Sequence, residues 1–143
     1  MNIGNLIEGR ASSDIVSCTV DQTMRDVVAL LADRRIGALP VMEQGRVAGI
    51  FSERDVLYCL AKEGAAALDR PVRDVMTAEP ITVQRNHSIL GALGLMTDRR
   101  VRHLPVVEDG RLVGFISIGD LVKYRMDRIE SDVAAMRDYI RST

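Results

Sequence analysis

The sequence predicts an α+β fold in which two tandem βαββα repeats pack around a pseudo-twofold axis and an extended C-terminal helix follows. The main observation is an internal repeat: Leu30–Asp55 recurs 65 residues later as Leu95–Asp120, and 13 of the 26 aligned residues are identical without a gap. Such self-similarity indicates one structural unit used twice. One copy cannot cover both faces of its small sheet, so the copies are expected to pack against each other.

Each copy is expected to begin with a short strand and an amphipathic helix. The β-prone strand is Val16–Cys18 in the first copy and Ile81–Val83 in the second. In the first copy the helix starts at Met24, and its apolar residues are spaced by three and four. Thr23 is the expected N-cap of this helix, and Ser88 is the expected N-cap in the second copy.

The next two elements of each copy are predicted to form a β-hairpin. In the first copy, the apolar runs Ala38–Met42 and Val47–Phe51 are separated by Glu43–Arg46. The second copy has Glu108–Arg111 at the same place, with Asp-Gly at its centre. An Asp-Gly pair between apolar runs is typical of a tight hairpin turn.

These elements divide the chain into three expected parts. Residues 7–66 form the first repeat, residues 71–128 the second, and residues 129–143 a helical tail. The link from Glu63 to Pro71 is short and contains Gly64, which can stop a helix. Because the link is short, we expect the two repeats to be docked together.

The C-terminal helix carries an apolar seam with alternating steps of four and three residues, as in a coiled coil. Its members are Val122, Met126, Ile129, Val133, Met136 and Ile140. Much of this seam lies beyond the residues that the repeat requires. It either folds back on the body or contacts a second copy of the chain, and we favour a homodimer.

Composition argues against several classes of protein. With 19 basic and 20 acidic residues, the chain offers no electrostatic case for nucleic acid or an anionic membrane. No apolar stretch approaches the ~20 residues that span a bilayer, and no signal peptide is apparent. Cys18 and Cys59 lie in apolar surroundings without a Cys or His partner at metal-ligand spacing. We therefore expect free thiols, no metal site and a cytoplasmic location.

The repeat resembles a cystathionine-beta-synthase (CBS) domain. The resemblance rests on Arg35–Val41 and Gly45–Asp55, which the second copy matches from Arg100 to Asp120, and on Asp74–Thr77, which is similar to the segment that commonly opens such a domain. It extends from about Ile7 to Tyr124. It implies a stand-alone CBS pair, or Bateman module, that binds adenine nucleotides in clefts between its repeats and associates into homodimers.

A Ser-x-x-Asp motif opens the second helix of each copy, as Ser52/Asp55 and Ser117/Asp120. One interpretation is a capping box, which needs no ligand, although the short Asp is expected to reach the N-cap amide less easily than Glu. In the other, the helix N-terminus and the Ser bind a phosphate, and the Asp one turn on accepts from both ribose hydroxyls. The resemblance implies the second pair of roles, and both interpretations stay open.

The resemblance also places an adenine slot between the first strand and the stretch that precedes Pro-Val. The candidates are Ser17, Cys18, Thr82 and Val83 on the first strands, and Gly37, Ala38, Leu39, Pro40, Arg102, His103, Leu104 and Pro105 near Pro-Val. The alternative is that these residues are ordinary strands entering a core. Because Arg102 and His103 replace Gly37 and Ala38, we expect unequal clefts, with a phosphate met by Arg102 or His103 in the second.

We therefore predict a regulatory module rather than an enzyme. Its expected ligand is AMP, with ATP or NAD as alternatives, and it is expected to signal occupancy to a separate, unidentified protein. One alternative is a homodimerisation scaffold with vestigial clefts. Another is an enzyme of unrecognised type. Against an enzyme, His87 and His103 have no nucleophile arranged around them, and no Gly-rich phosphate loop is present. No catalytic residue is predicted.

Overall fold

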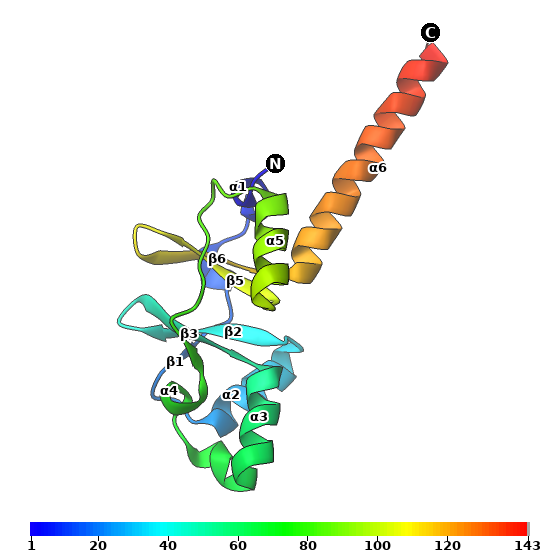
Figure 1. Ribbon diagram of the computed structural model, residues 1–143. Coiled ribbons are helices and arrows are strands. Elements are labelled where there is room, and N and C mark those ends of the chain that lie inside the picture. The colour runs from blue at the N-terminus through cyan, green and yellow to red at the C-terminus, as the bar shows by residue number, and fades with distance from the viewer. Residues whose placement is uncertain (143) are drawn as a thin grey trace.

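The computed structural model describes residues 1–142 and consists of two similar units and a long C-terminal helix (Figure 1). The first half contains α1 (Ile3–Ile7), the 3-10 helix η1 (Ser12–Asp14), β1 (Cys18–Thr19), α2 (Met24–Arg34), β2 (Ala38–Glu43), β3 (Arg46–Ser52), α3 (Glu53–Glu63), the 3-10 helix η2 (Gly64–Asp69) and α4 (Val72–Val75). The second half contains β4 (Thr77–Ala78), α5 (Ile89–Arg99), β5 (His103–Glu108), β6 (Arg111–Ser117) and α6 (Ile118–Ser142). The predicted α+β repeat fold is confirmed.

Both hairpins form where the sequence predicts them. Strand β2 pairs antiparallel with β3, and β5 pairs antiparallel with β6. The first turn has positive φ at Gln44 (52°) and Gly45 (79°), and the second at Asp109 (51°) and Gly110 (77°). Two successive positive φ angles define a type I′ turn, whose twist matches that of the strands.

The predicted N-caps also form. The Thr23 hydroxyl accepts from the amide of Asp26 at 3.2 Å, and the Ser88 hydroxyl accepts from the amide of Gly91 at 2.9 Å. Each hydroxyl satisfies one of the amides that a helix start leaves without a partner.

The first strand of each copy is shorter than predicted. Strand β1 comprises only Cys18–Thr19 and pairs parallel with β2. In the second copy, the expected strand Ile81–Val83 is reduced to one parallel bridge between Val83 and Val106. In each copy the parallel pairing with the hairpin is short because the chain then turns toward the N-cap of the next helix.

The opening segments of the two copies are exchanged between the two hydrophobic cores. The core behind the first hairpin includes Val72 and Val75 of α4. The core behind the second hairpin includes Ile3, Leu6 and Ile7 of α1. Strand β4 likewise pairs with β3 of the first copy, so the first sheet has the order β1-β2-β3-β4. Because these segments cross over, the two cores do not divide the chain at one point. The repeat boundaries at residues 7–66 and 71–128 remain predictions from the sequence.

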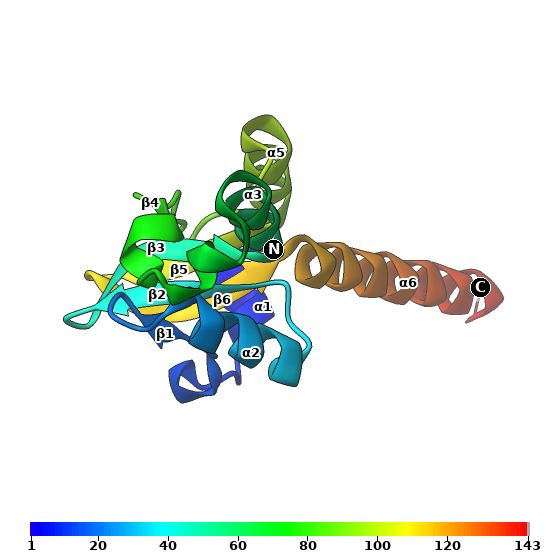
Figure 2. The ribbon, with the colours of Figure 1, turned by 90° about the horizontal axis from the view of Figure 1, so that it is seen from below.

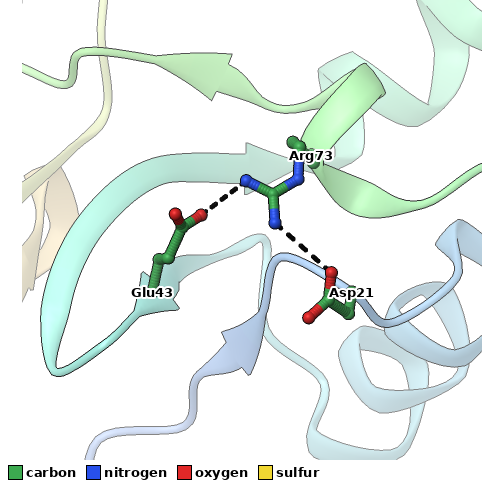
Figure 3. Close-up of polar contacts among 3 residues, drawn as sticks. All are labelled: Asp21, Glu43 and Arg73. Carbon is green, nitrogen blue, oxygen red and sulfur yellow. Dashed lines mark hydrogen bonds and ion pairs between the residues drawn. The ribbon is translucent and has the colours of Figure 1, made fainter.

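An ion-pair cluster helps to hold α4 against the first copy. The guanidinium of Arg73 donates to Glu43 at 2.6 Å and to Asp21 at 3.3 Å (Figure 3). The hydrogen bond to Glu43 is the main cause that raises the pKa of Arg73. The cluster joins α4, the end of β2 and the turn after β1.

Helices α3 and α5 lie on one side of the strands, and α2 lies on the other (Figure 2). Helix α6 leaves the body and does not fold back on it (Figure 1). Its residue Leu121 is buried, whereas residues 126–142 are all exposed. The last residue of the predicted tail, Thr143, lies outside the described residues. Within residues 1–142, no helix combines the length and the apolar character that crossing a membrane would require.

Candidate functional site

A cleft of about 480 Å³ lies where the first hairpin and α3 meet the start of β5, and we call it the first cleft. Both copies contribute to its walls. Its lining residues are Gly37, Ala38, Ile50, Ser52, Glu53, Arg54, Asp55, Leu57, Tyr58, Thr77, Arg100, Val101, Arg102 and His103. Its volume falls within the range of small-molecule sites, about 300–1,000 Å³.

The N-terminus of α3 forms one wall of the first cleft. Ser52 is its N-cap, and the Ser52 hydroxyl accepts from the amide of Asp55 at 3.4 Å. The amide of Ser52 donates in return to Asp55 Oδ2 at 3.0 Å. Ser117 and Asp120 make the same two hydrogen bonds at 3.0 and 2.9 Å. The shorter Asp side chain therefore does reach the N-cap amide, and both motifs are complete capping boxes.

Capping leaves part of the Asp55 carboxylate for other partners. Its Oδ2 atom faces Ser52, whereas its Oδ1 atom accepts from the hydroxyl of Thr77 on β4 at 3.2 Å. A ligand hydroxyl could take the place of the Thr77 hydroxyl. The capping role and a sugar-binding role are thus compatible at Asp55.

Three arginines line the first cleft. Arg100 and Arg102 come from the loop before β5, and Arg54 comes from the first turn of α3. The guanidinium of Arg54 donates to the carbonyl oxygen of Arg100 at 3.3 Å, which joins the two copies across the cleft. The amides of Glu53 and Asp55 already donate to the Gly37 carbonyl oxygen and the Ser52 hydroxyl. The three arginines outnumber the two lining carboxylates, Glu53 and Asp55, and together with the positive end of the α3 dipole they create an environment that suits an anion.

His103 lies between the first cleft and a second cavity. It lines the first cleft, and its ring stacks on Phe115 at a centroid distance of 5.5 Å and an interplanar angle of 14°. Burial is the main cause that lowers the pKa of His103, Arg102 lowers it further, and Asp120 and Glu53 oppose the shift. The imidazole is therefore biased toward its neutral form.

The second cavity is smaller and mostly apolar. We call it the second cleft; its volume is about 270 Å³, and Ile36, Ala38, Val113 and Phe115 are among its lining residues. The motif Ser117/Asp120 is not in its lining. Asp120 instead pairs with Arg10 at 3.8 Å, between half-exposed side chains.

The pseudo-symmetry explains why the clefts differ. A shift of 65 residues converts Arg102, His103 and Arg54 of the first cleft into Gly37, Ala38 and Gly119. Arg102 and His103 were expected to serve the second cleft, but in the structure they line the first cleft together with Ser52 and Asp55 and do not line the second.

Six residues predicted for the site line the first cleft: Gly37, Ala38, Ser52, Asp55, Arg102 and His103. The others lie elsewhere. Cys18, Leu39, Pro40, Val83, Leu104 and Pro105 are buried along the strands, Ser117 and Asp120 cap α6, Thr82 is exposed outside both clefts, and Ser17 lines a hollow between the hairpin tips. Burial raises the pKa of the Cys18 thiol to about 11, as expected for a core residue.

The sequence did not indicate Thr77 as a cleft residue. The strand that it assigned to the adenine, Thr82–Val83, packs against β5 instead, and β4 with Thr77 occupies the edge of β3 beside the cleft. The segment Asp74–Thr77 was noticed only as the opening of a domain. Arg100, which also lines the cleft, is the C-cap of α5.

Comparisons with known proteins agree on one family. A family model described as CBS domain matches residues 5–62 and 72–127. The mitochondrial CBS domain-containing protein CBSX3 of Arabidopsis thaliana is 37% identical over 129 residues, which are 87% of this chain and 63% of the relative. The crystal structure of the CBS-domain containing protein ATU1752 from Agrobacterium tumefaciens is 37% identical, covers 87% of this chain and 92% of its own, and has a TM-score of 0.81. The structure of CBSX2 in complex with AMP is 25% identical, covers 88% and 96%, and has a TM-score of 0.76.

Proposed function

We propose, from the premise that the chain belongs to the CBS-domain family, that it is a regulatory module which binds an adenine nucleotide in the first cleft. The observation that carries the proposal is the arrangement of this cleft. A carboxylate, Asp55, and three arginines, Arg54, Arg100 and Arg102, line the same space of about 480 Å³. A ribose phosphate carries hydroxyl donors at one end and an anion at the other, which is the pattern that these walls complement.

Each part of the nucleotide has a proposed partner. The ribose hydroxyls donate to Asp55, displacing Thr77 from Oδ1. The phosphate lies near the N-terminus of α3 and the arginines. The adenine contacts the apolar lining, which includes Ile50 and Val101. AMP is the proposed ligand, supported by the complex of CBSX2 with AMP, and ATP and NAD are the alternatives.

We propose one nucleotide per chain. The second cleft is smaller, and its one lining arginine, Arg10, already pairs with Asp120. Since a ligand in the first cleft contacts both repeats, its binding can favour one arrangement of the repeats over another. A separate protein would respond to that change.

Two further proposals concern the setting of the module. The free thiols of Cys18 and Cys59 suit a reducing compartment such as the cytoplasm. The module is also proposed to act as a homodimer, for which the next section argues a surface. Its role is binding and not turnover, so a bound nucleotide should be recovered chemically unchanged after incubation.

The test is isothermal titration calorimetry of the full chain with AMP, ATP and NAD, repeated on Asp55→Asn. Asparagine keeps a side-chain oxygen that can accept from the Ser52 amide, so the cap of α3 is retained. The lost charge weakens the ribose contact, because hydrogen bonds to an ionised acceptor are the stronger ones. We expect AMP affinity to fall roughly tenfold or more.

Asp120→Asn is the matched control, because it changes the same capping box at the start of α6 outside the first cleft. Its AMP affinity is expected to stay within about twofold of the parent. No binding of any adenine nucleotide would contradict the proposal and favour a scaffold with vestigial clefts. Equal loss in both variants would contradict the assignment to the first cleft.

A further inference from the structure

The part of α6 that leaves the body presents an apolar seam along its length. Exposed fractions are 47% for Val122, 53% for Met126, 44% for Ile129, 43% for Val133 and 62% for Met136. Ile140 continues the same spacing. Side chains spaced by four and three residues lie on one side of a helix, so the seam is a continuous apolar stripe.

A single helix of this kind gains little by itself. Residues 126–142 make a segment about 25 Å long at 1.5 Å per residue, and every one of them is exposed. Isolated helices of about 12–15 residues are marginal in water. A second helix whose apolar residues have the same spacing would bury this stripe and stabilise it.

Heptad positions follow from the steps of the seam. Met126 and Val133 occupy a positions, and Val122, Ile129 and Met136 occupy d positions. The residues beside the seam are then Lys123, Glu130 and Arg137 at e, and Arg125 and Asp132 at g. Among residues 1–142, the side chains of Glu130, Asp132 and Arg137 make no ion pair or hydrogen bond.

These flanking charges favour pairing with a parallel copy of the same helix. In a parallel coiled coil, each g residue lies near the e residue five positions later on the other helix. Arg125 then meets Glu130 of the second copy, and Asp132 meets Arg137. Both contacts are attractive, and the twofold axis makes each of them twice.

The antiparallel arrangement with full overlap brings like charges together. There e faces e and g faces g, so that Glu130 meets Glu130, Asp132 meets Asp132, and Lys123 meets Arg137. A staggered antiparallel pair can avoid these repulsions only by leaving one end of the seam uncovered, either Met136 or Val122 with Met126, depending on the direction of the shift. The charge pattern therefore distinguishes the parallel arrangement from the antiparallel one.

We propose that α6 is a dimerisation helix: residues 122–140 of two copies of this chain form a parallel, in-register, two-stranded coiled coil. The twofold axis runs along the paired helices. It places the two CBS pairs side by side at the N-terminal end of the coiled coil. This inference concerns the second copy only and holds whether or not the first cleft binds a nucleotide.

The first test is the mass of the ligand-free full chain by sedimentation equilibrium. We expect a species of twice the 15.8 kDa chain mass. The variant Ile129→Glu/Val133→Glu places charge in the seam and is expected to be monomeric at concentrations where the parent is dimeric. The control Ser131→Glu/Ala135→Glu adds the same charge outside the seam and is expected to remain dimeric. Circular dichroism and melting of the body check that both variants fold.

The second test determines helix orientation. Arg137→Glu places a carboxylate against Asp132 in the parallel pair and is expected to weaken the dimer roughly fivefold. Asp132→Arg/Arg137→Glu restores opposite charges and should return the dissociation constant to within about twofold of the parent. In the antiparallel pair, Arg137→Glu would instead face Lys123 and strengthen the dimer.

A disulfide gives an independent measure of the register. Met136→Cys, in a Cys59→Ser background, is expected to cross-link to itself on oxidation. Antiparallel overlap would place the two 136 positions about 15 Å apart, beyond the reach of a disulfide. A monomeric parent, a trimer or tetramer, a dimer that survives Ile129→Glu/Val133→Glu, or absence of the 136–136 cross-link would each overturn the proposal.

Discussion

Gly49 lies where β4 passes close to β3. A Cβ atom at this position would lie 2.6 Å from the carbonyl oxygen of Thr77 and 2.7 Å from Sδ of Met76. The backbone oxygen cannot move aside without separating the two strands. We expect Gly49→Ala to lower the free energy of unfolding by about 1–3 kcal/mol, as overpacking does in a close-packed interior. Urea denaturation measures this loss.

The second copy supplies the control for Gly49→Ala. At Gly114, the equivalent residue, a Cβ atom would meet the flexible Cδ1 atom of Ile7 at 3.2 Å. That side chain can shift by a few tenths of an ångström, so Gly114→Ala should cost less than Gly49→Ala. Because Thr77 also lines the first cleft, Gly49→Ala should weaken AMP binding as well. Equal stability of both variants would contradict this account of β4.

His103 is expected to make stability depend on pH. Burial lowers its pKa below the ordinary value of 6.5 in the folded chain. As the pH falls from about 7.5 to 5.5, the unfolded chain takes up a proton on this residue before the folded chain does. Stability is therefore lost as the pH falls through the window below 6.5 and is retained above it. Chemical denaturation across this range measures the slope.

The variant His103→Phe isolates that contribution. An aromatic ring at position 103 retains stacking on Phe115 but cannot titrate. The loss of stability between pH 7.5 and 5.5 should be smaller in the variant than in the parent. An unchanged slope would attribute the pH dependence to other groups and contradict this account of His103.

At the scale of elements, the Ser-x-x-Asp motif predicts a helix start but not a ligand site. The sequence predicted a helix start at Ser52, and the capping box confirms it. It could not decide whether Asp55 also faces a ligand, because capping alone explains the spacing. Thr77 and Arg102, which lie across the cleft, come from distant parts of the chain. Only the fold brings them together.

Elements with a strong local signal were predicted, and elements that depend on contacts with distant residues were missed. The hairpins and the two capped helices have strong local signals in turn residues and apolar spacing, and they form as predicted. Helices α1 and α4 have only five and four residues, too few for a periodic pattern. Their stability comes from packing in the core of the other copy, which no local pattern indicates.

At the scale of the whole molecule, two similar units produce unlike clefts. Both copies retain the backbone and the capping boxes, whereas the changes at Arg102 and Arg54 add two arginines to the first cleft that have no counterpart in the second copy. The opening segments cross between the cores, so neither unit is complete without the other. A nucleotide in the first cleft would therefore act on the arrangement of both units.

Truncation after Met126 separates binding from dimerisation. The second core includes Leu121, with Tyr124 packed against it, but no residue beyond Tyr124, so residues 1–126 retain every core contact of the body. We expect this variant to be monomeric in sedimentation and to bind AMP within about twofold of the full chain, because the first cleft draws no residue from α6.

The oligomeric state and the AMP affinity of the truncated chain test two separate proposals. Loss of AMP binding in the monomer would mean that the second copy completes the cleft, which would contradict a site built within one chain. A dimer that persists without residues 127–143 would move the interface to the body, where Leu57, Tyr58 and Leu90 are exposed at 66%, 66% and 61%. If binding persists and the dimer is lost, the first cleft and α6 are separate functional parts of one chain. The nucleotide then acts on the arrangement of the two repeats, and α6 brings two such modules together.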